Sequence, residues 1–412
     1  MQMKHPRTEH RSLNAVTTAV VALCAATGAH ATCTETGTFL TTHCGTDYVQ
    51  YLTDTGTATL TVNNHTTVSV ELTPHATSSG PYQHTLNVTG TTVVNNPSYS
   101  GLISQTNMAN RDIEVFVDPT VSITAGPGGF GGIWVRNDTS GNIRIESGAT
   151  VQSSGNQDGI NSVTNLGNSA VVNTGSVTSL NYRGLYSENG DSGHVGSGLD
   201  ATIVNDTGAV TNAFLATARA INYNGLAEIT NRGTLTSTTR QGAIAWAEVG
   251  TARIVNTGQI TSYDDHAAQV SAGGNVEVDN SGTLTSSDDP SYNTVRTGFS
   301  SIHAEADGTG TATVTNRVGG SVLSPDDYAV HLITASGNLT LTNDGTISGK
   351  GGVHVTSDTG SLQLTNNTQI TATGSTHEAL YVVKAGGGTI DNHGTLTGGG
   401  HALRSASGGL LT

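Results

Sequence analysis

Apolar and polar residues alternate in short runs along most of this chain, and many of the runs end in a similar phrase. A typical copy has two apolar residues at alternating positions, an asparagine, a glycine two residues later, and an apolar residue before Thr-Ser or Thr-Gly. Clear copies contain the asparagines Asn173, Asn231, Asn256, Asn280, Asn343 and Asn392 and the glycines Gly175, Gly233, Gly258, Gly282, Gly345 and Gly394. A period of two over a few residues is typical of β-strands with one buried face.

The spacing of these copies predicts the fold class. With looser copies at Asn205, Asn316 and Asn366, the phrase recurs about every 27 residues. A second apolar alternation lies between the copies, as in 133–135 and 243–247, so each unit offers three short strands. A propeller blade needs four strands in about 40 residues, which is more than this unit contains. We therefore expect an all-β protein, a right-handed parallel β-helix of about 10 or 11 three-stranded coils.

The repeated phrase predicts a corner between strands. Asparagine and glycine both tolerate the left-handed backbone region, so we expect each pair to turn the chain. Stacked corners place one asparagine above another, and their amides can form a ladder of hydrogen bonds. The alternating apolar residues then face inward, and Thr and Ser face solvent.

The amino terminus predicts export. Residues 4–11 are basic, residues 13–28 are mostly small and apolar, and 29–31 read Ala-His-Ala. This order is typical of a secretory signal peptide, here 1–31, with cleavage after Ala31. The alternative, a membrane anchor, requires about 20 apolar residues in a row.

Residues 32–114 lack the repeated phrase, and we expect them to form an amino-terminal cap with irregular first coils. Residues 115–412 form the repeat region. Cys33 and Cys44 remain after cleavage, and in an oxidising compartment they are expected to pair. A zinc site that includes the adjacent His43 is the alternative, with too few ligands for a strong site.

Composition narrows the function classes. Only 11% of residues are charged, and the net charge is −15. Nucleic-acid binding is not expected because the chain has no basic patch that could neutralise phosphates. No nucleotide, flavin or haem motif is present, so no cofactor is expected.

The signal peptide, the scarcity of Cys and Lys, and the repeated phrase together resemble the passenger domains of bacterial autotransporters, the pertactin-like and adhesin-like β-helices of type V secretion. The resemblance covers about residues 115–407. It implies export through the periplasm to the outer-membrane surface or the medium, and a role as adhesin or structural and virulence rod. The partners that it implies are a host cell-surface or matrix receptor, or sister cells by self-association.

The chain departs from that family at its carboxyl end. Autotransporters cross the outer membrane through a carboxy-terminal β-barrel, the translocator of the passenger. The residues after Arg404 contain no amphipathic strands of the length that such a barrel needs. We therefore expect the repeat region to be truncated and the translocator to be missing from this chain.

Two enzyme classes are the alternatives to a non-catalytic rod. His43, Asp112 and Ser192 stand in the order and short contexts of a trypsin-like serine protease, with Ser192 as nucleophile. However, His43 lies close to the mature amino terminus, and coil phrases begin before Ser192. Carbohydrate-active β-helix enzymes gather acids and bases on one face, whereas Arg is scattered along this sequence. We expect no catalysis.

Acidic pairs and histidines offer weaker candidate sites. Stacked carboxylates could bind calcium, but ordinary solvated corners are the simpler interpretation, and no metal is expected. The aspartates in question are Asp264, Asp265, Asp288, Asp289, Asp326 and Asp327. His303, His331 and His354 occupy the same strand of successive coils, where they could bind metal or sense pH, or be ordinary outward-facing strand residues.

The distribution of charge over the stacked coils distinguishes these hypotheses. Acids and bases clustered on one face would favour an enzyme. A bland face of Thr, Ser and Asn with extended loops would favour adhesion, which is the function that we predict.

Overall fold

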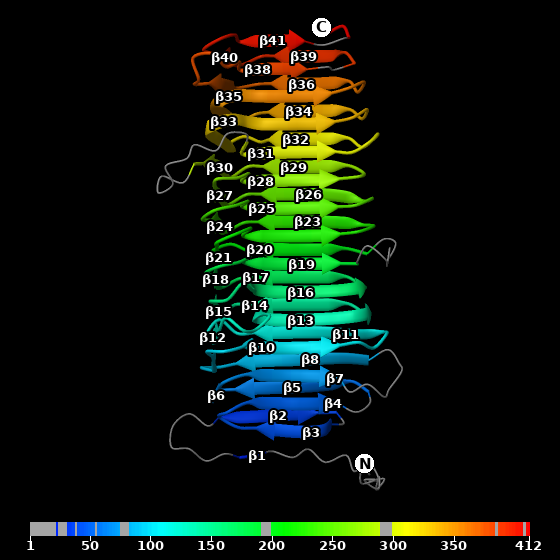
Figure 1. Cartoon of the computed structure of the whole chain (residues 1–412), viewed down its shortest axis with the longest axis vertical. Coiled ribbons are helices and arrows are strands. Elements are labelled where there is room, and N and C mark those ends of the chain that lie inside the picture. Colours follow the sequence, from blue (N-terminus) through cyan, green and yellow to red (C-terminus); the bar gives the residue numbers. More distant parts are fainter. Residues whose placement is uncertain are drawn as a thin grey trace, which may run out of the picture.

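The computed structural model is a straight rod of stacked β-strands (Figure 1). It describes residues 22–23, 31–37, 39–53, 56–74, 82–190, 199–288, 299–383, 386–406 and 409–412. In this part the chain is an all-β parallel solenoid of about 12 turns without a helix, which confirms the predicted fold class and exceeds the predicted number of coils by one or two. Accordingly, the described residues contain no helix long and apolar enough to cross a membrane.

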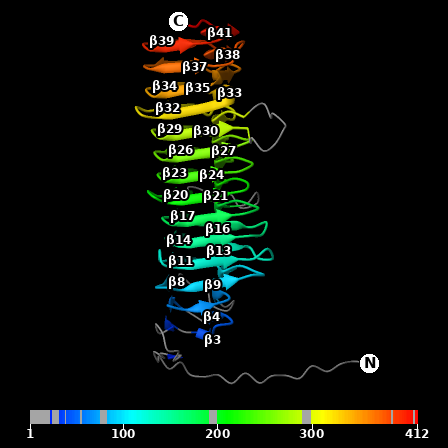
Figure 2. The ribbon, with the colours of Figure 1, turned by 90° about the vertical axis from the view of Figure 1, so that its left-hand side faces the viewer.

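Each turn adds one strand to each of three ladders, and each ladder stacks strands from successive turns (Figure 2). The first ladder is β1 (Ala22–Leu23), β2 (Thr32–Thr36), β5 (Ala58–Asn63), β8 (Tyr82–Thr89), β11 (Arg111–Val117), β14 (Ile143–Ser147), β17 (Ser169–Asn173), β20 (Ala201–Asn205), β23 (Leu226–Asn231), β26 (Thr251–Asn256), β29 (Val276–Asn280), β32 (Ala312–Asn316), β34 (Leu339–Asn343), β36 (Leu362–Asn366) and β39 (Gly388–Asn392). The second ladder is β6 (Thr66–Thr67), β9 (Val93–Asn96), β12 (Ser122–Ala125), β15 (Thr150–Ser153), β18 (Ser176–Ser179), β21 (Val210–Ala213), β24 (Thr234–Ser237), β27 (Gln259–Tyr263), β30 (Thr283–Ser287), β33 (Ser321–Thr334), β35 (Thr346–Ser357), β37 (Gln369–Ala372) and β40 (Thr395–Thr397).

The third ladder carries the candidate site described below. It consists of β3 (Phe39–Cys44), β4 (Val49–Thr53), β7 (Val70–Pro74), β10 (Leu102–Thr106), β13 (Gly131–Ser140), β16 (Asp158–Leu166), β19 (Leu185–Asn189), β22 (Ala218–Asn222), β25 (Ala243–Ala247), β28 (Ala268–Ala272), β31 (Ile302–Ala306), the later residues of β33 and β35, β38 (Leu380–Val383) and β41 (Leu403–Ala406). The long strands β33 and β35 pair in both the second and third ladders, and so join them into one sheet.

The core is a set of aliphatic columns inside the rod. In the first ladder, Ile145, Val171, Ile203 and Ile229 lie in register on consecutive turns, and each is at most 1% exposed. Burying such a side chain contributes about 2 kcal/mol relative to exposing it. Because every turn buries its apolar residues against the next turn, the alternation in the sequence becomes one continuous core.

The first turns differ from the rest by their strand direction. β2 pairs antiparallel with β5, and β3 pairs antiparallel with β4. Parallel stacking begins with β4 on β7 and β5 on β8, so the solenoid extends well into the segment 32–114 expected to be cap and irregular coils. Of the expected signal peptide, only Ala31 and the short strand β1 lie within the described residues, and β1 pairs with β2.

The predicted asparagine ladder is present. Eight hydrogen bonds join nine asparagines on successive turns, from Asn173 to Asn392, and in each the Nδ2 of one asparagine donates to the Oδ1 of the next at 2.7–2.9 Å. The first eight asparagines are 0% exposed. These bonds satisfy buried amides that would otherwise each cost about 1–3 kcal/mol.

The physical reason predicted for the corner glycines is wrong. None of the six has its φ in the left-handed region, which other glycines such as Gly208 and Gly319 do occupy. A Cβ on Gly258 would instead lie 2.1 Å from the carbonyl oxygen of Gly233, and one on Gly282 would lie 2.0 Å from that of Gly258. The corners require glycine because each packs directly on the backbone of the preceding turn.

The ladder predicts the effect of a single amide deletion. Asn256→Ala should lower the free energy of unfolding by about 2 kcal/mol, because Asn280 Oδ1 loses the donor that lies 2.8 Å away in a buried position. Urea unfolding followed by tryptophan fluorescence measures this change. The exposed neighbour Thr257→Ala is the matched control and should change stability little. Equal effects of the two substitutions would contradict a stabilising role for the ladder.

Candidate functional site: a groove on the third ladder

Many outward positions of the third ladder carry aromatic, charged or other large polar side chains, where Thr and Ser were expected. One column of residues in register, here called the outer column, runs through Trp134, Asn161, Tyr186, Arg219, Ile244, Gln269, His303, His331, His354 and Tyr381. A parallel column two residues further along each strand contains Arg136, Val163, Glu188, Ile221 and Trp246. Both tryptophans of the chain therefore lie on this face.

Two adjoining hollows lie over these columns, and together we call them the groove. The N-terminal hollow, about 380 Å³, is lined by Phe130, Trp134, Arg136, Asn156, Gln157, Asp158, Asn161, Val163, Asn165, Tyr182, Arg183, Tyr186, Glu188 and Gly190. The C-terminal hollow, also about 380 Å³, is lined by Tyr182, Arg183, Leu215, Ala216, Arg219, Arg240, Gln241, Ile244, Trp246 and Gln269. The corner segments between the second and third ladders supply one wall, because they contribute Phe130, Tyr182 and Arg240.

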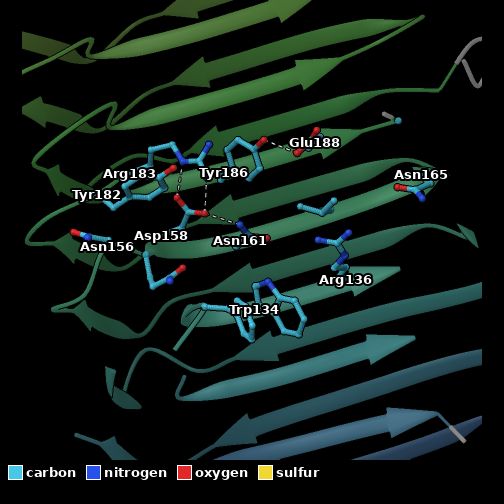
Figure 3. A pocket seen from close by; sticks show the side chains of 14 residues that line it. Trp134, Arg136, Asn156, Asp158, Asn161, Asn165, Tyr182, Arg183, Tyr186 and Glu188 are labelled. Atoms are coloured by element: carbon cyan, nitrogen blue, oxygen red, sulfur yellow. Dashed lines mark hydrogen bonds and ion pairs between the residues drawn. The ribbon is translucent and has the colours of Figure 1, made fainter. Parts of the chain in front are cut away.

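Arg183 organises the N-terminal hollow (Figure 3). Its Nε donates to Oδ1 of Asp158 at 2.7 Å, and its Nη2 donates to Oδ2 at 3.1 Å. Asn161 Nδ2 donates to the same Oδ2 at 2.5 Å. The guanidinium carbon lies 3.7 Å from the ring centroid of Tyr186 and 4.5 Å from that of Tyr182. A planar cation held against two rings and a carboxylate makes this part of the groove rigid.

Burial sets the protonation states here. It raises the pKa of the Asp158 carboxyl, and the guanidinium of Arg183 opposes that rise. Burial also raises the pKa of Tyr186, with a further contribution from the carboxylate of Glu188. Tyr186 therefore keeps its proton near neutral pH, and its hydroxyl donates to Glu188 Oε2.

Aromatic rings flank the groove at both ends. Phe130, which is 44% exposed, stacks on Trp134 with ring centroids 4.6 Å apart. At the other end Tyr223 packs edge-on against Trp246 at 5.4 Å. Four steps of about 4.8 Å separate strands β13 and β25, so the two tryptophans mark a stretch of about 19 Å along the rod.

Histidines continue the outer column beyond the groove. His303, His331 and His354 lie in one register column, as the sequence predicts, and His266 joins them from the preceding corner. Ring centroids are 4.6 Å apart between His266 and His303 and 4.5 Å apart between His331 and His354. Burial, followed by repulsion from neighbouring imidazoles, lowers the pKa of His266 and of His331 to about 3. His303, His331 and His354 are outward-facing strand residues, as expected, and each is half-buried beside the neighbouring rings of the stack.

The residues of the suggested protease triad do not form one site in the described structure. His43 lies on β3 in the cap, where Nε2 is 3.0 Å from Asp47 Oδ1. Asp112 lies on β11 in the first ladder, and its Oδ1 accepts from the backbone NH of Asn142 at 2.7 Å. Ser192 lies outside the described residues.

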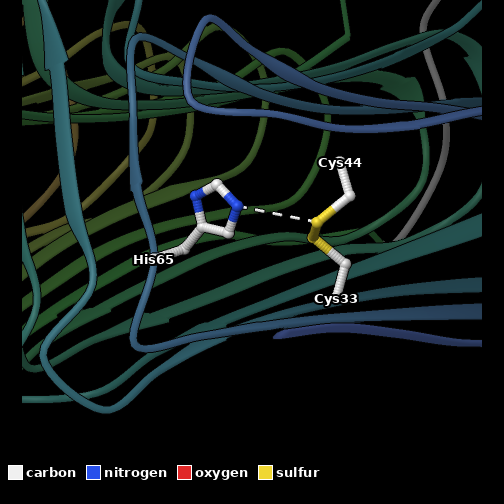
Figure 4. A group of neighbouring side chains, drawn as sticks. All are labelled: Cys33, Cys44 and His65. Carbon is white, nitrogen blue, oxygen red and sulfur yellow. Dashed lines mark hydrogen bonds between the residues drawn. A yellow bond between two sulfur atoms is a disulfide. The ribbon is translucent and has the colours of Figure 1, made fainter. Parts of the chain in front are cut away.

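The cysteine and histidine cluster of the cap is a structural staple (Figure 4). Cys33 and Cys44 form a disulfide, and the Cys44 sulfur lies 3.6 Å from Nε2 of His65. His65, not the adjacent His43, is therefore the third potential ligand of this cluster. In the disulfide form neither cysteine offers the thiolate that zinc requires.

The acidic pairs considered for calcium form no three-ligand group among the described residues, where only the cap cluster brings three potential ligand atoms within 4.8 Å of one another. The backbone NH of Asp288 donates to Oδ2 of Asp326 at 2.9 Å, which fits a hydrogen-bonded corner. Asp264 has a left-handed backbone, and Asp265 Oδ1 accepts from the NH of His266. Asp289 lies outside the described residues.

The groove is the feature that the sequence interpretation missed. Arg136, Arg183, Arg219 and Arg240 are scattered in the sequence, yet they gather in it with Asp158 and Glu188. The outward face of the third ladder is therefore not a surface of Thr, Ser and Asn alone, and charged side chains cluster on it. A signal existed, because aligning the second apolar run of each unit places Trp134, Tyr186 and Arg219 at one outward position.

Comparison with known proteins identifies no family. A scan against protein-family models found no match to this chain, and searches of curated proteins and of solved structures found none either. Function is therefore inferred from the groove itself.

Proposed function

We propose that this chain is a carbohydrate-binding β-solenoid, a non-catalytic adhesive rod that holds an extended glycan in the groove of its third ladder. In this proposal the protein is exported and displayed at a bacterial surface, as the predicted signal peptide and the resemblance to autotransporter passengers suggest. Its partner is a glycan of a host cell, of matrix or of a sister cell.

One observation carries the proposal. The outward columns carry three aromatic rings, Trp134, Tyr186 and Trp246, with the amide of Asn161 and the guanidinium of Arg219 between them. Aromatic faces cover the apolar face of a sugar ring, while amides and guanidinium groups bond its hydroxyls. A straight groove of repeated strands suits a linear polymer better than it suits a compact metabolite.

The polar groups support binding more than catalysis. Glycoside hydrolysis ordinarily uses two carboxyl groups that are free to reach the substrate. In the groove, Asp158 already accepts from Arg183 and Asn161, and Glu188 accepts from Tyr186. Tyr186 is not available as a general base near neutral pH, because its raised pKa keeps the phenol protonated.

A glycan array probed with the full chain tests the proposal. Phe130→Ala and Trp246→Ala should each weaken binding to the glycan identified by about tenfold, because an aromatic contact is worth on the order of 1 kcal/mol beyond its buried area. Tyr48→Ala removes a ring of similar exposure in the cap and is the matched control. Unchanged thermal unfolding would show that the variants are folded.

The outcomes separate the hypotheses. Absence of any glycan binding by the unmodified chain would overturn the proposal. The second candidate, a carbohydrate-active enzyme, is favoured only by the gathering of Asp158, Glu188 and Arg183 in one hollow. Shortening of the bound glycan, measured by mass spectrometry after incubation, would replace the adhesive rod with that enzyme.

A further inference from the structure

The two hollows of the groove differ in charge. Two arginines and two carboxylates line the N-terminal hollow, Arg136 and Arg183 with Asp158 and Glu188. The C-terminal hollow has Arg183, Arg219 and Arg240 in its lining and no Asp or Glu. In a chain with 31 acidic and 16 basic residues, this concentration of positive charge is local and unusual.

The arginines of the C-terminal hollow differ in their partners. Arg183 forms an ion pair with Asp158 and donates two hydrogen bonds to its carboxylate. Neither Arg219 nor Arg240 forms an ion pair with a carboxylate of the described residues. In that part of the chain, the Nε of Arg219 is also buried without a hydrogen-bond partner.

We propose that the groove selects acidic polysaccharides and that Arg219 and Arg240 bind a carboxylate or sulfate group of the sugar chain in the C-terminal hollow. This inference rests on the proposed glycan binding and names the class of glycan. It commits to an anionic sugar because the buried Nε of Arg219 has no hydrogen-bond partner among the described residues and no carboxylate lines this hollow, so an arriving oxyanion can accept a charge-assisted hydrogen bond there.

The surrounding side chains fit a sugar that carries such a group. Trp246 offers a ring face beside the arginines, and Gln241 and Gln269 offer amides for hydroxyl groups. Arg219 stands directly after Tyr186 in the outer column, so an anion at Arg219 lies in line with the N-terminal hollow. That hollow, with its balanced charges, can hold neighbouring sugar units through their hydroxyls.

The test compares matched ligands with the full chain. Chondroitin sulfate, its desulfated form and its carboxyl-reduced form separate sulfate from carboxylate, and polygalacturonate is paired with its neutral methyl ester. We expect at least one acidic polymer to bind, and its neutralised counterpart to bind about tenfold more weakly, because a charge-assisted hydrogen bond is lost. Binding of the acidic polymer should weaken with added salt.

Variants assign the anion to these arginines. Arg240→Gln should lower affinity for the acidic polymer about tenfold and flatten its salt dependence, and should weaken binding of the neutral form much less. Arg240 is exposed, so the variant is expected to fold, and Arg219→Lys, which keeps charge but loses the planar fork, gives a second measurement. Arg232→Gln alters an exposed arginine paired with Asp206 outside the groove and is the matched control.

Each failure has its own meaning. Equal affinity for acidic and neutral forms, without salt dependence, would overturn the acidic preference and leave glycan binding intact. No binding to any glycan would overturn the proposed function itself. Tighter binding to single-stranded DNA than to every glycan would overturn both the acidic preference and the proposed glycan binding, since the arginines would then bind phosphate groups of a nucleic acid.

Discussion

Gly258→Ala should lower the free energy of unfolding by about 3 kcal/mol, a large loss for one methyl group. The added Cβ would lie 2.1 Å from the carbonyl oxygen of Gly233 and 2.7 Å from the carbonyl carbon of Arg232. Both atoms belong to the backbone of the preceding turn, so the clash cannot be relieved by a change of rotamer. Denaturant unfolding measured by circular dichroism gives the stability of the variant.

A second glycine separates the two possible reasons for glycine at corners. Gly319 has a φ of +84°, and a Cβ placed on it meets nothing within 4 Å. Gly319→Ala should therefore cost only about 1 kcal/mol, the ordinary penalty of a left-handed alanine. If Gly319→Ala proved the more damaging, close packing between turns would not be what selects glycine at the repeated corner.

Acid should destabilise the rod through its histidine stack. The unfolded chain protonates histidine near its ordinary pKa of 6.5, whereas His266 and His331 have a pKa of about 3 in the folded protein. Stability that is complete above pH 6.5 is therefore lost as the pH falls toward 3, since only the unfolded state gains protons. At pH 4.5 the loss is about 3 kcal/mol for each of these histidines.

His331→Gln tests this prediction by removing one titrating ring. The acidic groups that face the stack are Asp265, Glu305, Asp327 and Glu378, and all of them remain in the variant. The difference between pH 7.5 and pH 4.5 in free energy of unfolding should shrink by about 3 kcal/mol. His393→Gln, at an exposed histidine in the corner directly after β39, should leave that difference unchanged. An unchanged pH dependence in His331→Gln would contradict the assignment.

The repeat made the fold predictable because one physical rule acts at every turn. An apolar alternation that recurs with a fixed period has to stack on itself, and this is enough to place Asn256 above Asn231 and to align His331 with His303. The repeat also gives the positions of the corner glycines, but it does not give the physical reason that glycine is needed at them. Glycine is required because each corner contacts the backbone of the previous turn, and this contact between turns cannot be read from one copy of the phrase.

The groove is formed by outward-facing side chains and corner segments that the repeated phrase does not mark. Trp134 and Trp246 each sit between two apolar residues, and in sequence they look like further members of the core alternation. Their outward direction follows from register, because Ile133 and Val135 are the buried neighbours of Trp134. The depth of the groove comes from corner segments such as the one that carries Tyr182 and Arg183. Those corners do not follow the repeated phrase, so the sequence pattern does not predict where they lie.

The asparagine ladder also gives the rod a direction. Every amide in it donates toward the next turn and accepts from the one before, so the side-chain dipoles from Asn173 to Asn366 point the same way along the axis. Such a chain polarises each of its members, and a single reversed amide would set oxygen against oxygen on one side. The two ends of the stack are thus electrically unlike. The turn that carries Asn173 presents an amide oxygen toward the turn before it, whereas every turn up to Asn366 offers an amide donor to the turn after it.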